Sequence, residues 1–194
     1  MSRRAVAAAG LLLCATGLVT GCSTTAHSVS ADYRFQAGGT KGLAVYSTRL
    51  EDHCGAGITT TMLSVEGIAA QRRVRDQFIV SNAFIKRDFE DPPGYFFVQE
   101  LAAGDYRVSQ LEVYSSRGGG TAQLDRHFTL APGAVHYLGE FYVTRPDCSR
   151  YRFEVNDEWA RDQALLFERV GSLRGAAVVS HVERLREVGV PHAQ

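Results

Sequence analysis

The chain has 194 residues, of which 45% are hydrophobic and 22% charged, and its 21 basic residues balance its 21 acidic ones. This length is enough for one domain with a sizeable core. The balanced charge argues against nucleic acid as a partner, because such binding needs a concentrated basic face.

The first 21 residues have the pattern of a secretory signal peptide. Arg3 and Arg4 precede an apolar run over residues 5–19, which is shorter than the roughly 20 residues of a transmembrane span. The stretch Val19-Thr20-Gly21-Cys22 resembles a bacterial lipobox, in which the cysteine sulfur receives acyl chains such as palmitate. The resemblance implies that Cys22 is the lipidated first residue of the mature chain. A signal peptide cleaved nearby without lipidation is the alternative.

Lipidation at Cys22 would make a bilayer of the bacterial cell envelope the first partner of this protein. In Gram-negative lipoproteins an aspartate after the cysteine favours the inner membrane, and here Ser23 follows Cys22. The resemblance therefore implies an outer-membrane lipoprotein facing the periplasm if the host is Gram-negative. Cleavage before Cys22 would leave 19 basic and 21 acidic residues, a formal charge of −2.

Four cysteines are present, and two of them belong to the leader and the lipobox. Cys14 leaves with residues 1–21 and Cys22 carries lipid, so Cys54 and Cys148 remain in an oxidising compartment. We expect a disulfide between them, closing a loop of about 94 residues. A metal-thiolate pair or a reactive thiol is the alternative, since His53 precedes Cys54.

Small and polar residues dominate positions 22–42 and predict a flexible, lipidated tether. After it, apolar residues alternate with polar ones in short segments separated by turn residues, which is typical of strands. We expect about eight strands, at 43–48, 58–65, 77–81, 95–101, 106–114, 121–130, 134–144 and 151–155. These predict a mainly β fold, a single antiparallel β-sandwich over residues 43–156.

Two local features refine this expectation. The apolar phase shifts between Val108 and Leu111, which predicts a β-bulge near Ser109 and Gln110. Pro132-Gly133 is expected to close a hairpin between the segments 121–130 and 134–144.

Residues 157–194 predict a helical tail packed on the sandwich. Trp159, Leu166 and Val170 share one helical face, with Asn156 or Asp157 as a cap and Gly171 as a stop. A second helix is expected over 176–188, although its first valines, at 178 and 179, could instead form a strand.

The segment Leu101-Ala102-Ala103-Gly104-Asp105-Tyr106-Arg107-Val108 resembles the signature of transthyretin-like sandwiches, such as carboxypeptidase regulatory-like domains. The segments 128–133 and 136–140 are similar to the next hairpin in bacterial lipoproteins of that shape. The resemblance implies a transthyretin-like fold and no catalytic residue, because the glycine and tyrosine of the motif are structural.

No motif of the chain names a reaction: nucleophile elbow, Walker loop, zinc helix and dinucleotide fingerprint are all missing from the sequence. The sharpest candidate pair is His127 and His136, which the expected hairpin places on one outer face. A metal or catalytic role would require a third group, His53 or a carboxylate. The ordinary alternative is a pair of solvated histidines, so we expect no resident metal or cofactor.

Two further segments have a structural and a functional interpretation. Asp88, Glu90 and Asp91 form either an exposed acidic turn or a calcium site. The aromatic run of residues 95–97 would expose at least one ring, as a sugar platform or a partner contact, unless the C-terminal helix covers it.

The sequence therefore favours a non-enzymatic, lipid-anchored envelope protein that serves as a binding or assembly module, with an envelope protein as its second partner. The alternatives are a metal-binding protein or hydrolase that uses His127 and His136, and a carbohydrate-binding module.

Overall fold

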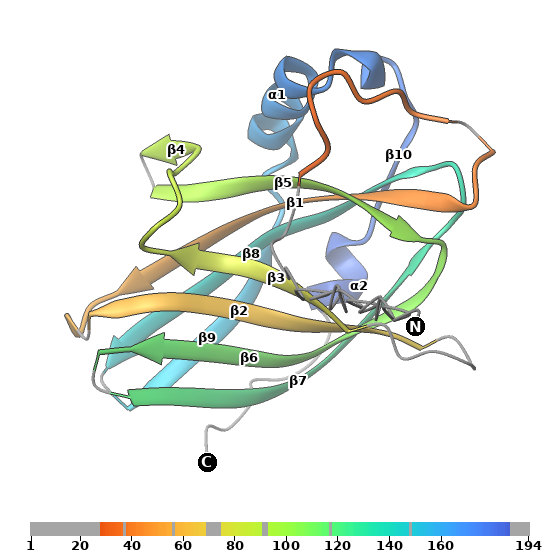
Figure 1. Cartoon of the computed structure of the whole chain (residues 1–194). Helices are drawn as coiled ribbons and strands as arrows, with labels where there is room; N and C mark the ends of the chain where they lie inside the picture. Colours follow the sequence, from red (N-terminus) through yellow and green to blue (C-terminus); the bar gives the residue numbers. More distant parts are fainter. Residues whose placement is uncertain are drawn as a thin grey trace, which may run out of the picture.

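A computed structural model describes residues 28–36, 38–55, 57–68, 75–90, 93–116, 118–147 and 149–186. The predicted leader, the lipobox and Cys22 lie outside these residues. The described chain is mainly β, with two sheets that pack face to face and two short α-helices (Figure 1). This architecture is consistent with the predicted β-sandwich.

The larger sheet has six strands in the order β10-β8-β1-β5-β4, and β9 also pairs with β8. Its strands are β1 (Lys41–Asp52), β4 (Phe89–Glu90), β5 (Pro93–Ala102), β8 (Val135–Asp147), β9 (Arg150–Asn156) and β10 (Val178–Ser180). The smaller sheet has four strands in the order β3-β2-β6-β7. They are β2 (Ile58–Gly67), β3 (Arg75–Asn82), β6 (Gly104–Ser115) and β7 (Gly118–Leu130).

The prediction of eight antiparallel strands is wrong in two respects. The described residues contain ten strands, because the two-residue β4 and the three-residue β10 join the larger sheet. Two pairings in that sheet are parallel, β1 with β8 and β10 with β8. Short segments such as these carry too few residues to show an alternation, and parallel pairing leaves no local signature.

The predicted hairpin at Pro132-Gly133 is also wrong. β7 pairs with β6 in the smaller sheet, whereas β8 pairs with β1, β9 and β10 in the larger one. The turn therefore passes from one sheet to the other. Gly133 still takes a left-handed conformation there (φ +62°), and its N–H donates to the Lys41 carbonyl at 2.8 Å.

The predicted bulge is confirmed, because the register of β6 against β7 shifts between Val108 and Gln110. The motif that precedes it has the structural role expected from its residue types. Gly104 adopts φ +149°, and the Tyr106 hydroxyl donates to the Ala102 carbonyl at 2.7 Å across the turn.

Aromatic rings from both sheets form the centre of the core. Tyr46 of β1 stacks on Phe78 of β3 at 4.3 Å and on Phe97 of β5 at 5.1 Å, between ring centroids. Its hydroxyl donates to Gln99 Oε1 at 2.9 Å, so the buried phenol is satisfied. Offset stacking of this kind stabilises a core beyond the area it buries, and here it joins the two layers.

The tail contains α1 (Trp159–Arg169), a single 3₁₀ turn at Gly171–Leu173, β10 and α2 (Val182–Arg186). The helix predicted from Trp159 is present, with Leu166 buried and Asp157 accepting the Trp159 N–H at 3.1 Å. The second predicted helix is mostly wrong. Residues 178–180 form the alternative strand, because β10 extends the open edge of β8, and within the described residues 176–186 the helix covers 182–186.

Candidate functional site

The N-terminal segment is held on the sandwich in its described part, although we expected residues 22–42 to form a flexible tether. The Val29 N–H donates to the Val98 carbonyl of β5 at 2.8 Å, and the Ser28 hydroxyl accepts from the Val98 N–H at 3.2 Å. Tyr33 and Phe35 pack partly buried against the core. The described part of the segment thus begins at the edge of β5 and continues beside α1 (Figure 1).

The same edge of β5 is closed further along by an ion pair. Asp88 and Arg169 lie 2.6 Å apart. Asp88 Oδ2 accepts from the Phe96 N–H at 2.6 Å, while Arg169 donates to the Phe96 carbonyl at 3.1 Å. Together the two side chains make the hydrogen bonds to the Phe96 backbone that a neighbouring strand would otherwise make. An edge covered in this way is protected from pairing with another chain.

A small polar pocket of about 250 Å³ lies where the N-terminal segment meets β1 and β5. Within it the Glu100 carboxylate accepts from Tyr33 at 2.7 Å and from Lys41 at 2.6 Å. These contacts lower the pKa of Glu100, and burial together with Glu100 raises the pKa of Tyr33 to about 12. At this pocket, the hydrogen bond from Tyr33 and the ion pair with Lys41 at Glu100 therefore hold the N-terminal segment against the larger sheet. It is lined by Tyr33, Arg34, Phe35, Gln36, Gly39, Thr40, Lys41 and Glu100.

The aromatic run that we considered as a sugar platform is buried. Tyr95, Phe96 and Phe97 are at most 7% exposed. Tyr95 and Phe97 belong to the core, and Phe96 lies under Arg169 of α1, with the guanidinium 5.3 Å from its ring centroid. The C-terminal helix thus covers the outward ring, as the structural interpretation of this segment requires.

His127 and His136 are not neighbours. His127 lies on β7 of the smaller sheet, exposed and 2.8 Å from Asp125, whereas His136 lies on β8 of the larger sheet and is 2% exposed. The prediction that they share one face depended on the hairpin that does not form. The described residues hold no group of three or more His, Cys, Asp or Glu that could bind a metal ion.

His136 instead contacts His181, a pair that no pattern in the sequence predicts. His136 Nε2 accepts from the Ala131 N–H at 2.9 Å, so its proton lies on Nδ1, which is 2.9 Å from His181 Nε2. Burial lowers the pKa of both rings, and in His181, where His136 and Arg184 add to the effect, to about 4. Both imidazoles are therefore neutral at pH 7, and they link β8 to the segment that enters α2.

A network of buried polar groups lies between α1 and the larger sheet. Asp162 of α1 is completely buried and accepts from Ser47 of β1 at 2.6 Å and from Tyr137 of β8 at 2.9 Å. Arg161 donates to its other oxygen at 2.9 Å. Burial raises the pKa of Asp162, against the opposing effect of these three partners.

Arg161 extends this network to a second buried carboxylate. Its Nη1 lies 3.1 Å from Glu140 Oε1, while Arg49 and Asn156 reach the other oxygen of Glu140 at 3.5 and 3.2 Å. The Ser47 hydroxyl beside the Asp162 carboxylate resembles a nucleophile beside a base. Both side chains are 0% exposed, however, and their oxygens are hydrogen-bonded to each other, to Tyr137 and to Arg161. The arrangement holds α1 on the sheet and offers no accessible reacting atom.

The remaining predicted site residues are placed only in part. Cys54 is half-buried just after β1, with its Sγ 4.0 Å from the Arg145 carbonyl, and Cys148 lies outside the described residues. In the acidic turn, Asp88 is engaged by Arg169 and the Phe96 N–H, Glu90 is exposed, and Asp91 lies outside the described residues.

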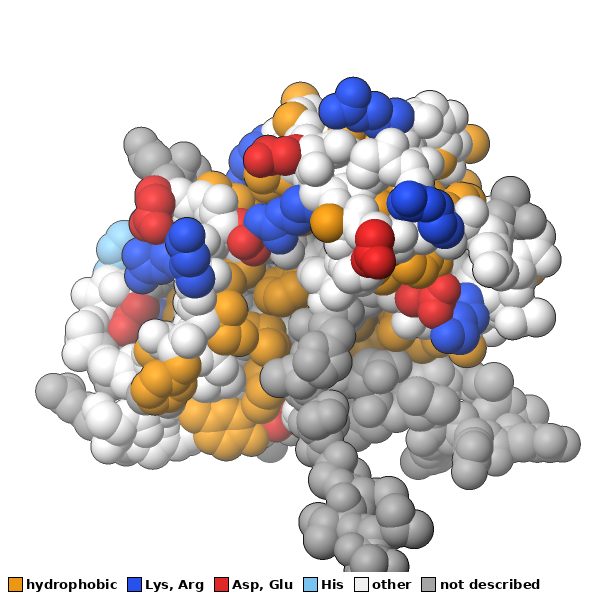
Figure 2. All heavy atoms as spheres, turned by 45° about the horizontal axis from the view of Figure 1, so that its top comes forward, with side chains coloured by type: hydrophobic (Ala, Val, Ile, Leu, Met, Phe, Trp, Pro, Cys, Tyr) orange, Lys and Arg blue, Asp and Glu red, His pale blue; other side chains and the backbone are white. Residues whose placement is uncertain are grey.

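Basic and acidic side chains are interspersed over the end of the molecule that carries α1 (Figure 2). This face has no concentrated positive charge, which agrees with the balanced composition. Among the described residues no helix is long and apolar enough to span a membrane.

Comparison with known proteins finds no protein-family model and no curated protein that matches the chain. Two solved structures are similar in part. A leucine-rich repeat protein from Bacteroides thetaiotaomicron shares 15% identity over 66% of this chain and 16% of its own, with a TM-score of 0.32. A protein from Parabacteroides distasonis, described provisionally as a cell adhesion protein, shares 12% identity over 60% and 38%, with a TM-score of 0.33. Both TM-scores are too low to identify a fold family.

Proposed function

We propose that this protein is a lipid-anchored lipoprotein of the bacterial cell envelope whose β-sandwich is a non-catalytic binding or assembly module. The observation that carries the proposal is the lipobox-like stretch Val19-Thr20-Gly21-Cys22, and the contacts of the described segment add that the path from Cys22 to the domain is short. Ser28 and Val29 are bonded to β5, and Cys22 precedes Ser28 by only six residues. Six extended residues span about 20 Å at most, so acyl chains on Cys22 would hold the domain close to the bilayer.

The polar groups of the domain support a binding role over a catalytic one. Two of the buried carboxylates, Asp162 and Glu140, accept hydrogen bonds that join α1 to the larger sheet. A third, Glu112, accepts from Ser64 and Tyr114 within the smaller sheet. The two neutral histidines bind each other and a backbone N–H. These groups have structural partners instead of facing a cavity that could hold substrate.

The smaller sheet offers the surface for a protein partner. β7 is a strand of 13 residues at the end of its sheet, and among the described strands it pairs only with β6. An end strand of this length can accept a strand from another protein through main-chain hydrogen bonds. The edge of β5 is occupied by Asp88, Arg169 and residues 28–29. On β7, α2 covers the part near Arg126, whose Nη1 donates to the Arg186 carbonyl at 3.5 Å, so the partner surface is the remainder of that strand.

The anchor is tested by comparing the native chain with Cys22→Ala, and with Cys54→Ser as the matched control. We expect the native chain and Cys54→Ser to fractionate with membranes and to partition into detergent, and Cys22→Ala to do neither. Mass spectrometry of the mature N-terminal peptide should show acyl chains on Cys22. A water-soluble native chain with an unmodified Cys22 would overturn the proposal.

A further inference from the structure

The loop between β3 and β4 presents an apolar side chain to solvent. Phe84 is 85% exposed, the highest value for a large hydrophobic side chain among the described residues, and the neighbouring Ile85 is 38% exposed. Lys86 and Arg87 follow directly in the sequence. Two apolar residues next to two cations form a surface with affinity for a lipid headgroup region.

The loop is held in place by hydrogen bonds. The Phe84 N–H donates to Asn82 Oδ1 at 2.8 Å, and the Tyr95 hydroxyl donates to the Asn82 carbonyl at 2.8 Å. At its other end the Asp88 N–H donates to the Gly94 carbonyl at 2.9 Å. Both ends of the loop are thus fastened to β5, so Phe84 is presented at a fixed place.

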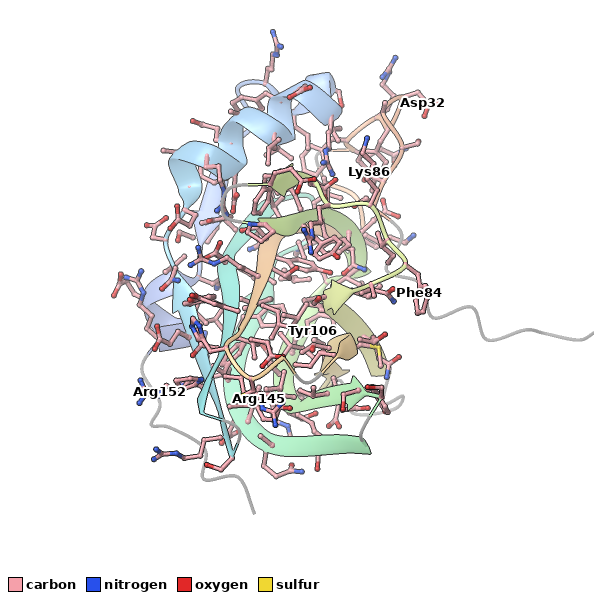
Figure 3. The ribbon with its side chains drawn as sticks, turned by 90° about the vertical axis from the view of Figure 1, so that its left-hand side faces the viewer. Asp32, Phe84, Lys86, Tyr106, Arg145 and Arg152 are labelled. Carbon is pink, nitrogen blue, oxygen red and sulfur yellow. The ribbon has the colours of Figure 1, made fainter. Side chains whose placement is uncertain are left out.

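The loop and the N-terminal segment belong to the same edge of the molecule. The loop is bonded to residues 94–96 of β5, and Ser28 and Val29 are bonded to Val98 of the same strand. Phe84, Lys86 and Asp32 lie along one side of the molecule in Figure 3. Because Ser28 follows Cys22 by six positions, a bilayer that holds Cys22 lies within about 20 Å of this edge.

The charges of the loop complement an anionic surface. Asp88 is paired with Arg169 at 2.6 Å, and its other oxygen accepts the Phe96 N–H, so its charge is directed into the fold. Arg87 lies 3.7 Å from the exposed Glu90, while Lys86 extends toward solvent. Glu90 offsets the charge of Arg87, so the tip of the loop presents the exposed cation Lys86 close to Phe84, which suits contact with anionic phospholipid.

We propose that Phe84 and Ile85 insert into the bilayer that holds Cys22 and fix the orientation of the domain, with the β5 edge toward the lipid. This inference rests on the proposed function, because the anchor brings the bilayer to this edge. It goes beyond that function by assigning a second, protein-made contact with lipid.

The test uses tryptophan as a depth probe in the full acylated chain. Trp159 is the only tryptophan, and Trp159→Phe keeps a ring against Tyr137. Into this background we introduce Phe84→Trp and, as the control, Val179→Trp. Val179 is 45% exposed on β10, at the opposite edge of the larger sheet from β5 and β4. Both proteins are reconstituted into vesicles of phosphatidylethanolamine and phosphatidylglycerol.

We expect the emission of the Phe84→Trp protein to shift to shorter wavelength and to lose roughly half its intensity when acyl-brominated lipid is included, as for a ring at the headgroup–acyl boundary. The Val179→Trp protein should show neither change. Equal, unquenched emission from both proteins, with Cys22 acylated, would overturn the loop proposal and leave the proposed function standing. A shift at position 84 that requires added envelope protein would also overturn it.

Two further outcomes are decisive. If Cys22 carries no acyl chain, the proposed function fails, and the same vesicles added to the soluble Phe84→Trp protein show independently whether the loop binds lipid. If Trp159→Phe prevents folding, hydrogen exchange of the native chain replaces the fluorescence. The amides of residues 83–87 should then exchange more slowly on vesicles than in the water-soluble Cys22→Ala chain, and unchanged exchange would contradict insertion.

Discussion

Two imidazole rings, His136 and His181, are in direct contact beneath the turn that joins the two sheets. Their neutral forms are favoured, because burial opposes a charge on either ring and, at His181, His136 and Arg184 add to this effect. The contact joins β8 to the residues that lead into α2, so the protonation state of this pair affects how firmly the end of the chain is held.

The pair predicts that stability falls in acid. The folded-state pKa of His181 is about 4, below the ordinary 6.5, so the unfolded chain binds more protons between these values. The stability that the neutral His181 contributes is fully present above pH 6.5, and it is lost as the pH falls from 6.5 toward 4. We expect the free energy of unfolding, measured in urea, to decrease over this range through this residue by less than the full linkage value of about 3 kcal/mol, because solvent screens the partly exposed ring.

The variant His181→Gln isolates the effect, because an amide can still accept from His136 Nδ1 but does not titrate. Its unfolding free energy should change less between pH 6.5 and 4 than that of the native chain. His127→Gln is the matched control, since His127 is exposed and lies 2.8 Å from Asp125, away from the His136–His181 pair. Equal pH dependence in the two variants would contradict the assignment.

The helix α1 is fastened to its sheet by charge as well as by apolar burial. Leu166 is buried against the core, but it is Asp162 that contacts both β1 and β8 through Ser47 and Tyr137. Because Arg161 joins Asp162 to Glu140, loss of one carboxylate leaves a guanidinium partly buried without that partner.

Asp162→Ala is therefore expected to reduce the free energy of unfolding by about 3–5 kcal/mol, the cost of breaking a buried charge pair. Asp162→Asn, which retains hydrogen-bonding atoms at the same place, should cost less. Glu168→Ala, an exposed acidic position on the same helix, should change stability by about 0.5 kcal/mol or less. Urea titration measures all three, and a loss in Asp162→Ala no larger than in Glu168→Ala would show that apolar packing alone holds the helix.

At the scale of elements, the sequence predicts which segments form strands better than it predicts which strands pair with each other. Alternation revealed the eight longer strands, and the phase shift at Ser109 revealed the bulge, because both depend on neighbouring residues. The crossing of Pro132-Gly133 between sheets depends on the pairing of β8 with β1, some 90 residues away, and no local pattern records it. The same reason explains why His136 was matched with His127 instead of His181.

The whole molecule is organised around the parallel pair β1 and β8, which brings distant parts of the chain to a common end. Asp52 of β1 is opposite Arg145 of β8, and the His53 N–H donates to the Arg145 carbonyl at 3.3 Å. Both strands run toward this end, where Cys54 follows β1 by two residues and Cys148 follows the last residue of β8. A disulfide there would fasten the ends of the two central strands together.

The common end of β1 and β8 explains what the predicted Cys54–Cys148 bond would do for the fold. The bond would close about 94 residues, for which chain-entropy models allow up to roughly 4–5 kcal/mol. We expect a thiol reagent to label the denatured mature chain only after reduction, and reductant to lower its thermal midpoint. Cys54→Ser and Cys148→Ser should show the same lowered midpoint, insensitive to reductant, because either change removes the same cross-link. Labelling of the unreduced chain, or unequal midpoints for the two variants, would instead favour separate thiols at the end of β1 and β8.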